Sequence, residues 1–138
     1  MSGLLDTSMV VRYLTGQPPD LAMLAAQIID SEEHLLITDV VVAETAYVLT
    51  SVYGVPREAV IDTLVLLLQK RNIFPFALRK ETLLQALLLC RPSGRISFAD
   101  ALVWAATTET KNKLVYSLDA RFPRDGIEVR RSRTSLRG

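Results

Sequence analysis

The sequence predicts an α/β fold in which helices cover both faces of a central parallel sheet. Three observations support this prediction. Short apolar runs of strand length alternate along the chain with longer segments of helical periodicity. Proline, glycine and polar residues separate the two kinds of segment. The 138 residues contain no internal repeat and no interdomain linker, so their length suits one domain with one core.

The predicted elements follow one another in order. The strands are short and mostly apolar, and they span residues 3–5, 34–38, 73–76, 114–117 and 127–129. The helices carry apolar residues three and four positions apart, and they span residues 9–14, 21–32, 40–52, 56–68, 82–90 and 98–110. Asp20 and Asp39 each precede a helix and are predicted N-caps. Pro56 suits the first position of its helix, and Pro75 favours an edge position for its strand.

Composition excludes several classes of protein. With 49% hydrophobic and 22% charged residues, the chain is globular rather than disordered. Its apolar runs fall far short of the roughly 20 residues that a membrane span needs, and Asp6 interrupts the run that a secretory signal would require. Cys90 and His34 are the only residues of their types, which excludes an internal disulfide and a cysteine- or histidine-based metal site. We therefore expect a cytoplasmic protein with no membrane partner.

The charge is unevenly distributed along the chain. Residues 1–69 hold two basic and nine acidic residues, a net charge of −7, whereas residues 70–138 hold fourteen basic and six acidic residues, a net charge of +8. We expect one domain over residues 1–130, followed by a basic tail over 131–138 that is solvated or forms a phosphate-binding patch.

Four acidic residues stand in unusual surroundings. Asp6 ends the first predicted strand, and Asp119 follows the fourth. Glu44 and Asp100 each lie within an otherwise apolar helical run, with no basic residue within four positions. A carboxylate in apolar surroundings either rises in pKa or finds a cation. If the four acids meet, their oxygen atoms suit Mg²⁺, which is commonly held through a few carboxylates and waters.

Three of the four acids also have a purely structural interpretation. Asp6 and Asp119 would serve as N-caps, and the segment from Ser97 to Asp100 matches a capping box. Glu44 lies about one turn inside its helix, beyond any capping position. The four acids together, two of them directly after strands, favour a metal site over separate structural roles.

The motifs around these acids resemble those of PIN-domain ribonucleases, and in particular the single-domain VapC-type toxins of toxin–antitoxin modules. They are Leu-Leu-Asp6-Thr7-Ser8, Ala43-Glu44, Phe98-Ala99-Asp100-Ala101-Leu102 and Ser117-Leu118-Asp119, and the resemblance covers nearly the whole chain in order. It implies a three-layer α/β/α fold with strand order 3-2-1-4-5, which would place the strands bearing Asp6 and Asp119 side by side. It also implies Mg²⁺- or Mn²⁺-dependent RNA cleavage, homodimers and a small inhibitory protein partner.

The resemblance also suggests roles for single residues. Asp6, Glu44 and Asp100 would hold the ion, and Asp119 would complete the site directly or through water. Thr7 and Ser117 would bond the carboxylates or a metal-bound water. Candidates for contacts to RNA phosphates come from the basic second half, namely Arg91, Arg95, Lys111, Lys113 and Arg121. Many family members carry a further acid before the third motif, where this chain has Ser93 and Ser97, so firm binding of a second ion is in question.

Residues 40–68 carry more leucine and valine than one small core needs, so part of this surface is predicted to bind a second copy or a partner helix. Three functions besides a nuclease stay open. A PIN-like module would bind a partner or RNA without cutting. A haloacid-dehalogenase-like phosphatase needs a second aspartate where this chain has Ser8, and a receiver-type signalling domain needs paired acids and a lysine that are not visible.

Overall fold

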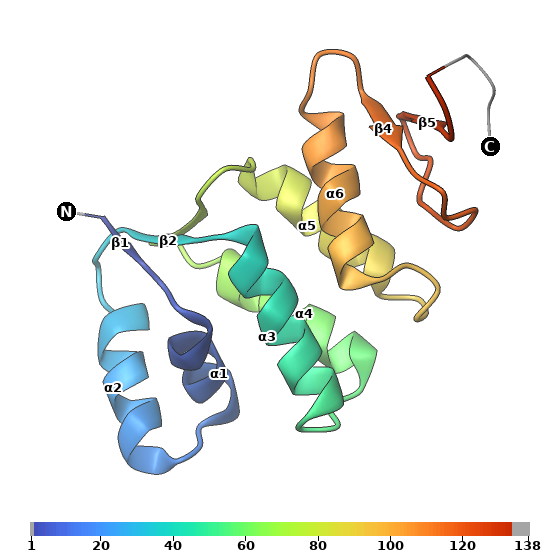
Figure 1. The fold of residues 1–138 in the computed structure, drawn as a ribbon. Helices are drawn as coiled ribbons and strands as arrows, with labels where there is room; N and C mark the ends of the chain where they lie inside the picture. The colour runs from blue at the N-terminus through green and yellow to red at the C-terminus, as the bar shows by residue number, and fades with distance from the viewer. Residues whose placement is uncertain (1, 134–138) are drawn as a thin grey trace.

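The computed structural model describes residues 2–133, so Arg137 and the end of the predicted basic tail lie outside the described residues. This part of the chain contains six helices, a three-stranded sheet and a two-stranded sheet, and Figure 1 shows how they are arranged. The elements in order are β1 (Gly3–Leu4), α1 (Thr7–Thr15), α2 (Pro19–Ile29), β2 (Leu35–Ile37), α3 (Asp39–Ser51), α4 (Arg57–Leu68), β3 (Ile73–Pro75), α5 (Lys80–Cys90), α6 (Phe98–Thr108), β4 (Leu114–Tyr116) and β5 (Glu128–Arg130).

All the strand pairings described are parallel, as the alternation of strands and helices predicts. β1 pairs with β2 and β2 with β3, so the first sheet has the order β1-β2-β3. β3 lies at the edge of this sheet, which confirms the interpretation of Pro75. The mixed α/β architecture with parallel strands is consistent with the predicted three-layer α/β/α class.

One strand pairing differs from the expected order 3-2-1-4-5. β4 pairs with β5 in a separate two-stranded sheet, and among residues 2–133 β1 and β4 are not paired. The β4–β5 pair is held on α6 instead, because the Trp104 indole N–H donates to the backbone carbonyl of Asp125, 2.9 Å away, and Phe122 and Val129 are buried. In Figure 1 the two groups of strands consequently lie on opposite sides of the helices α3 and α6.

The helix boundaries depend on local hydrogen bonds. The prediction that Asp39 caps α3 is wrong, because the Thr38 hydroxyl accepts the Val41 amide hydrogen and Asp39 falls inside the first turn. Asp20 likewise lies in the first turn of α2, which begins at Pro19 without a side-chain cap. Pro56 precedes its helix rather than opening it, because α4 begins at Arg57.

The core lies where α3, α4, α5 and α6 pack against one another and against the first sheet. Aliphatic side chains from these helices dominate it, among them Val42, Leu49, Ile61, Leu64, Leu83 and Leu87. The apolar stripe of α2 is only partly used, since Ala25 and Ile29 are buried whereas Leu21, Leu24 and Ile28 remain exposed. No helix in the described part of the chain is long and apolar enough to cross a membrane.

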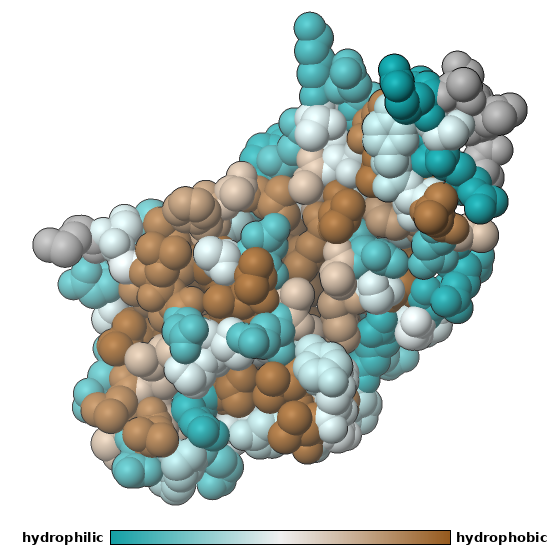
Figure 2. Space-filling view, viewed as in Figure 1, coloured by the Kyte–Doolittle hydropathy of each residue, from teal (hydrophilic) through white to brown (hydrophobic). Residues whose placement is uncertain are grey.

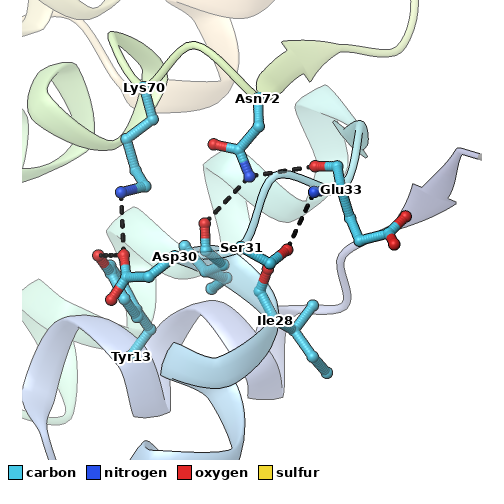
Figure 3. A network of polar contacts seen from close by, with 8 residues as sticks. Tyr13, Ile28, Asp30, Ser31, Glu33, Lys70 and Asn72 are labelled. Carbon is cyan, nitrogen blue, oxygen red and sulfur yellow. Dashed lines mark hydrogen bonds and ion pairs between the residues drawn. The ribbon is translucent and has the colours of Figure 1, made fainter.

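A polar network joins the first two helices to β3, as Figure 3 shows. The Tyr13 hydroxyl donates to the Asp30 carboxylate, which also accepts from the Lys70 ammonium at 2.9 Å. The Asn72 amide donates to the backbone carbonyls of Ile29 and Glu33, both at 3.1 Å. These contacts fix the end of α2 against the start of β3, at the amino-terminal edge of the first sheet.

Candidate active site

Asp6 lies between β1 and α1, where the sequence predicts it. Its carboxylate caps α1 by accepting from the backbone amide of Ser8 at 3.3 Å and from the Ser8 hydroxyl at 2.8 Å. The hydrogen bonds from Ser8 lower the pKa of the Asp6 carboxyl, which keeps it ionised and acceptor-only near neutral pH. The side chain is exposed, so the cap leaves the carboxylate open to a further ligand.

Glu44 lies in the second turn of α3, and its side chain is exposed. The expectation that apolar neighbours bury this carboxylate is therefore wrong. Its helix buries Val42, Thr45, Ala46 and Leu49, and Glu44 projects from a different face. Within residues 2–133 the carboxylate takes part in no hydrogen bond and no ion pair, so neither a cap nor a salt bridge explains it.

Asp100 lies in the first turn of α6 and is half-buried. Its backbone amide donates to the Ser97 hydroxyl at 3.0 Å, which confirms one half of the capping box. The other half is absent in the described residues, because the Asp100 carboxylate accepts no hydrogen bond. The capping interpretation therefore accounts for Ser97, and the Asp100 carboxylate has no hydrogen-bond partner among the described residues beyond the favourable field of the α6 N-terminus.

Asp119 follows β4 and is exposed. Its carboxylate accepts from the backbone amide of Arg121 at 2.8 Å, and its own amide donates to the Ser117 hydroxyl at 3.1 Å. Ser117 thus contacts the backbone of Asp119 rather than its carboxylate. The interpretation of Asp119 as an N-cap is wrong, because no helix lies between β4 and β5, and its carboxylate orders the turn that leads away from β4 instead.

The four acids do not form a single cluster. Within residues 2–133, no group of three or more acidic, histidine or cysteine side chains is close enough to hold a metal ion. The helices that carry three of the acids are nevertheless neighbours, because α3, with Glu44, packs against α1, which follows Asp6, and against α6, with Asp100. Asp119 follows β4, which pairs with β5 and not with β1 in the described residues, so it does not share a sheet edge with Asp6.

Two buried hydroxyls next to these acids lack partners. The side-chain oxygens of Thr7 and Thr45 are buried and make no hydrogen bond among the described residues. They follow Asp6 and Glu44 directly in the sequence. A buried unpaired hydroxyl costs about 1–3 kcal/mol, and such groups often mark a place for a water or ion. Thr7 is one of the predicted supporting residues, whereas Thr45 carries no signal in the sequence beyond its position beside Glu44.

Arg57, at the start of α4, organises the approach to Asp100. Its guanidinium donates to the backbone carbonyls of Ser93, at 2.9 Å, and Ile96, and it lies 4.2 Å from the centre of the Phe98 ring. These contacts hold the α5–α6 loop and the start of α6 against α4. The sequence offers no signal for this role, because the partners lie more than 35 positions away.

The predicted RNA-contacting residues fall into three groups. Arg91 is engaged elsewhere, because its guanidinium forms a two-pronged ion pair with the Asp62 carboxylate at 2.8 and 3.0 Å. Lys111 and Lys113 are exposed in the α6–β4 loop. Arg95 and Arg121 line one hollow on the surface, together with Arg124, which no pattern in the sequence singles out.

Comparison with known proteins places this arrangement in a class. The PIN domain family model matches residues 3–126, which is most of the chain and includes all four acids. No curated protein and no solved structure matches the sequence. The chain belongs to the PIN domain family.

This membership defines the class of protein more firmly than any single residue does. PIN domains are generally nucleases that commonly use divalent metal ions, and the fold suggests RNA as the bound substrate. The match gives no support to a haloacid-dehalogenase-like phosphatase or a receiver-type signalling domain.

Proposed function

We propose that this protein is a metal-dependent endoribonuclease whose ion is held by Asp6, Glu44 and Asp100. The observation that carries the proposal is that Glu44 and Asp100 present carboxylates with no hydrogen-bond or ion-pair partner within residues 2–133, on packed helices next to the α1 that Asp6 caps. Glu44 lies beyond the first turn of α3, where the helix dipole gives a carboxylate no benefit, so a ligand-binding role explains it better than a structural one. Asp100 lies in the first turn of α6, where the helix dipole and a ligand can both favour its charge.

The residues present fit Mg²⁺, with Mn²⁺ as a substitute. The acids offer only oxygen donors, which both ions accept. The unpaired hydroxyls of Thr7 and Thr45 belong to the residues that follow Asp6 and Glu44 in the sequence, and they could accept or donate a hydrogen bond to a water near the ion. When bound, a divalent ion supplies a water of lowered pKa and neutralises charge on the scissile phosphate.

The four acidic residues would then have different roles in binding the ion. Asp6 is held ionised and oriented by Ser8, so it offers a fixed negative charge at the end of β1. Glu44 and Asp100 are free of competing contacts within residues 2–133 and can adjust to the ligand. Asp119 is the fourth member, and it would join the others when the β4–β5 pair moves towards the free edge of β1, since the carboxyl ends of parallel strands share one edge of a sheet.

The test is cleavage of a mixed single-stranded and structured RNA with Mg²⁺ or with chelator. We expect Asp100→Asn and Glu44→Gln to lose nearly all cleavage, because each keeps its shape and removes only a charge. Matched controls are Asp20→Asn and Glu32→Gln, which change exposed acids outside the site. Cleavage by Asp100→Asn above a few per cent of wild type, or equal losses in the controls, would contradict the proposed ligand set.

We further propose that the protein acts as the toxin of a toxin–antitoxin module, as a homodimer bound by a small antitoxin protein. Exposed apolar side chains support a protein partner, and they lie on α2, α3 and α4: Leu21, Met23, Leu24, Val40, Tyr47 and Leu66. Figure 2 shows apolar residues over this end of the molecule. A soluble monomer rarely leaves large apolar patches in water. Growth arrest on expression of the chain alone, absent with Asp100→Asn, supports this role; unaffected growth with an active enzyme contradicts it.

A second candidate function is an RNA-binding module that does not cut. The observation that favours it is the absence of a three-acid cluster within residues 2–133. It predicts RNA binding that is the same with Mg²⁺ and with chelator, and no cleavage products under either condition. The cleavage assay above therefore separates the two functions directly.

A further inference from the structure

A hollow of about 320 Å³ lies between two loops that are distant in the sequence. One wall is the end of the α5–α6 loop, with Arg95 and Ile96, and the other is the segment after β4. We name it the arginine hollow, and its lining residues are Arg95, Ile96, Ala120, Arg121, Phe122, Pro123, Arg124 and Asp125. The lining includes three arginines and one aspartate.

Both walls are held in place by contacts already described. Arg57 donates to the carbonyl of Ile96, which fixes the first wall, and Trp104 donates to the carbonyl of Asp125, which fixes the second. The buried ring of Phe122 anchors the turn between them, and the Asp119 carboxylate accepts the Arg121 amide at its start. The arginines therefore project from a supported frame rather than from two loose loops.

The positive charge of the residues that line the hollow favours an anionic ligand. Arginine keeps its charge in proteins, so all three arginines that line the hollow remain cationic. A concave surface concentrates the field of like charges and raises the local concentration of counter-ions. The ion pair from Arg121 Nε to Asp119 Oδ1 is long, at 3.9 Å, and leaves the Arg121 guanidinium able to bind another group.

A phosphate group fits this chemistry best. Guanidinium presents a planar fork of N–H donors that matches two phosphate oxygens, which makes arginine a preferred residue for phosphate recognition. The volume is at the lower end of the range for ligand pockets and leaves room for a phosphate with part of its sugar. Three arginines around one hollow would neutralise the charge of one or two phosphates.

The position of the hollow links it to the candidate active site. Ile96 immediately precedes Ser97, the N-cap of α6, and Asp100 lies in the first turn of that helix. Ala120 immediately follows Asp119. We propose that the arginine hollow binds a backbone phosphate of the RNA strand beside the one that is cut, and so sets the position of the strand along α6. This inference rests on the proposed function only in taking RNA as the ligand.

The test is binding of a short fluorescent single-stranded RNA to the full chain in chelator, where no cleavage occurs, over a series of salt concentrations. Three variants probe the hollow, namely Arg95→Gln, the triple variant Arg95→Gln/Arg121→Gln/Arg124→Gln, and Ala120→Trp, which fills the hollow without changing charge. Arg79→Gln is the control for charge, because Arg79 is exposed and lies outside the hollow. Circular dichroism melts confirm that each variant is folded.

We expect the slope of log K against log salt to fall by roughly 0.7 for Arg95→Gln and by about 2 for the triple variant, since each lost phosphate contact removes one counterion release. Ala120→Trp should weaken binding although its charge is unchanged, and Arg79→Gln should bind as wild type does. Inorganic phosphate should compete with RNA on wild type but not on the triple variant.

Three results would overturn the proposal. Ala120→Trp binding like wild type would show that positive charge acts without the hollow. An equal loss of slope in Arg79→Gln would show that the charge is diffuse. Phosphate binding to wild type together with unchanged RNA affinity in the triple variant would show that the hollow takes free phosphate instead. None of these results depends on cleavage, so they are distinct from failure of the proposed function.

Discussion

At the scale of single residues, the buried hydroxyls of Thr7 and Thr45 are the least expected feature of the molecule. Each is buried without a hydrogen-bond partner in the described structure, and Thr45 is fully inaccessible to solvent. Valine has nearly the same shape as threonine but no hydroxyl. A threonine at such a position gives a lower free energy of unfolding than a valine would. Its hydroxyl is useful only if it binds a water or an ion, and this is the role we expect for it.

We expect Thr7→Val to increase the free energy of unfolding in chelator by up to about 1–3 kcal/mol, because it removes an unpaired buried hydroxyl. Its melting temperature should rise accordingly. The same substitution should reduce RNA cleavage, whereas Thr7→Ser, which keeps the hydroxyl, should retain it. Thermal melts and cleavage assays of the two variants give the comparison. A less stable Thr7→Val would show instead that the hydroxyl already has a partner.

Cys90 is buried in the core, where its thiol lies 3.7 Å from the carbonyl of Ser97. Burial raises the pKa of the thiol to about 11. At pH 8 only roughly 0.1% of it is thiolate in the folded state, so a disulfide reagent should react slowly until the protein unfolds.

The raised pKa of Cys90 also makes stability depend on pH on the alkaline side. Between the unfolded pKa near 9 and the folded value near 11, the folded state binds more protons than the unfolded state. Stability from this group is therefore complete below pH 9 and falls as the pH rises towards 11. Denaturant unfolding at pH 8 and pH 10, with Cys90→Ala as the control, measures the difference. Rapid labelling of the native protein at pH 8 would contradict the buried environment.

At the scale of elements, local signals and distant contacts determine different features. The alternation of strands and helices, the edge position of β3 and the Ser97 cap follow from patterns of a few residues, and the structure confirms them. The cap of α3 cannot be assigned from sequence, because Thr38 and Asp39 are adjacent and both are good caps. The role of Arg57 is invisible in the sequence because its partners are set by tertiary packing.

In the candidate site, too, some features can be predicted from local sequence and others depend on distant contacts. The four acids can be named from the sequence because charges stand out in apolar runs. Whether they converge depends on the pairing of β1 with β4, a contact between strands about 110 residues apart, and no local pattern determines it. The arginine hollow depends on two loops meeting, so the sequence singles out Arg95 and Arg121 as basic candidates but not Arg124.

The Arg57 contacts give a prediction for the α4 element. We expect Arg57→Lys to destabilise the fold by about 1–3 kcal/mol, because a lysine cannot donate to two carbonyls in the fixed fork of a guanidinium. It should also weaken RNA binding, because the wall that carries Arg95 is no longer held. Arg79→Lys, at an exposed position, is the matched control. Equal stability of the two variants would show that Arg57 does not hold the α5–α6 loop in place.

At the scale of the whole molecule, β1 and β4 each have an edge that pairs with no other strand among residues 2–133, which leaves room for rearrangement. Both strands are short, and Leu4 and Leu118, at or just beyond their carboxyl ends, are 59% and 76% exposed. Exposed edges and apolar side chains favour pairing with another strand. Joining β1 to β4 would bury them and bring Asp119 to the edge where Asp6 lies.

A shared metal site gives a prediction for global stability. Like charges close together destabilise the fold when no ion is present, so Asp100→Asn should melt at or above the wild-type temperature in chelator. With Mg²⁺ at 100 times its dissociation constant, wild type should gain roughly 2.7 kcal/mol, and the mutant far less. Paired thermal melts with and without the ion measure both effects. An equal response of the two proteins to Mg²⁺ would show that Asp100 does not bind it.

The uneven charge of the chain affects how the protein turns towards a charged partner and how it behaves on ion-exchange resins. The acidic half, residues 1–69, forms β1, β2 and the helices α1 to α4. The basic half, residues 70–138, includes β3, α5, α6, β4 and β5. In Figure 1 the acidic half runs from blue to green and the basic half from green-yellow to red. A protein with a net charge of only +1 thus carries a large electric dipole moment. Near pH 8 and at low salt, such a molecule can adhere to both anion- and cation-exchange resins, and in front of a polyanion it turns its basic end forward before any specific contact forms.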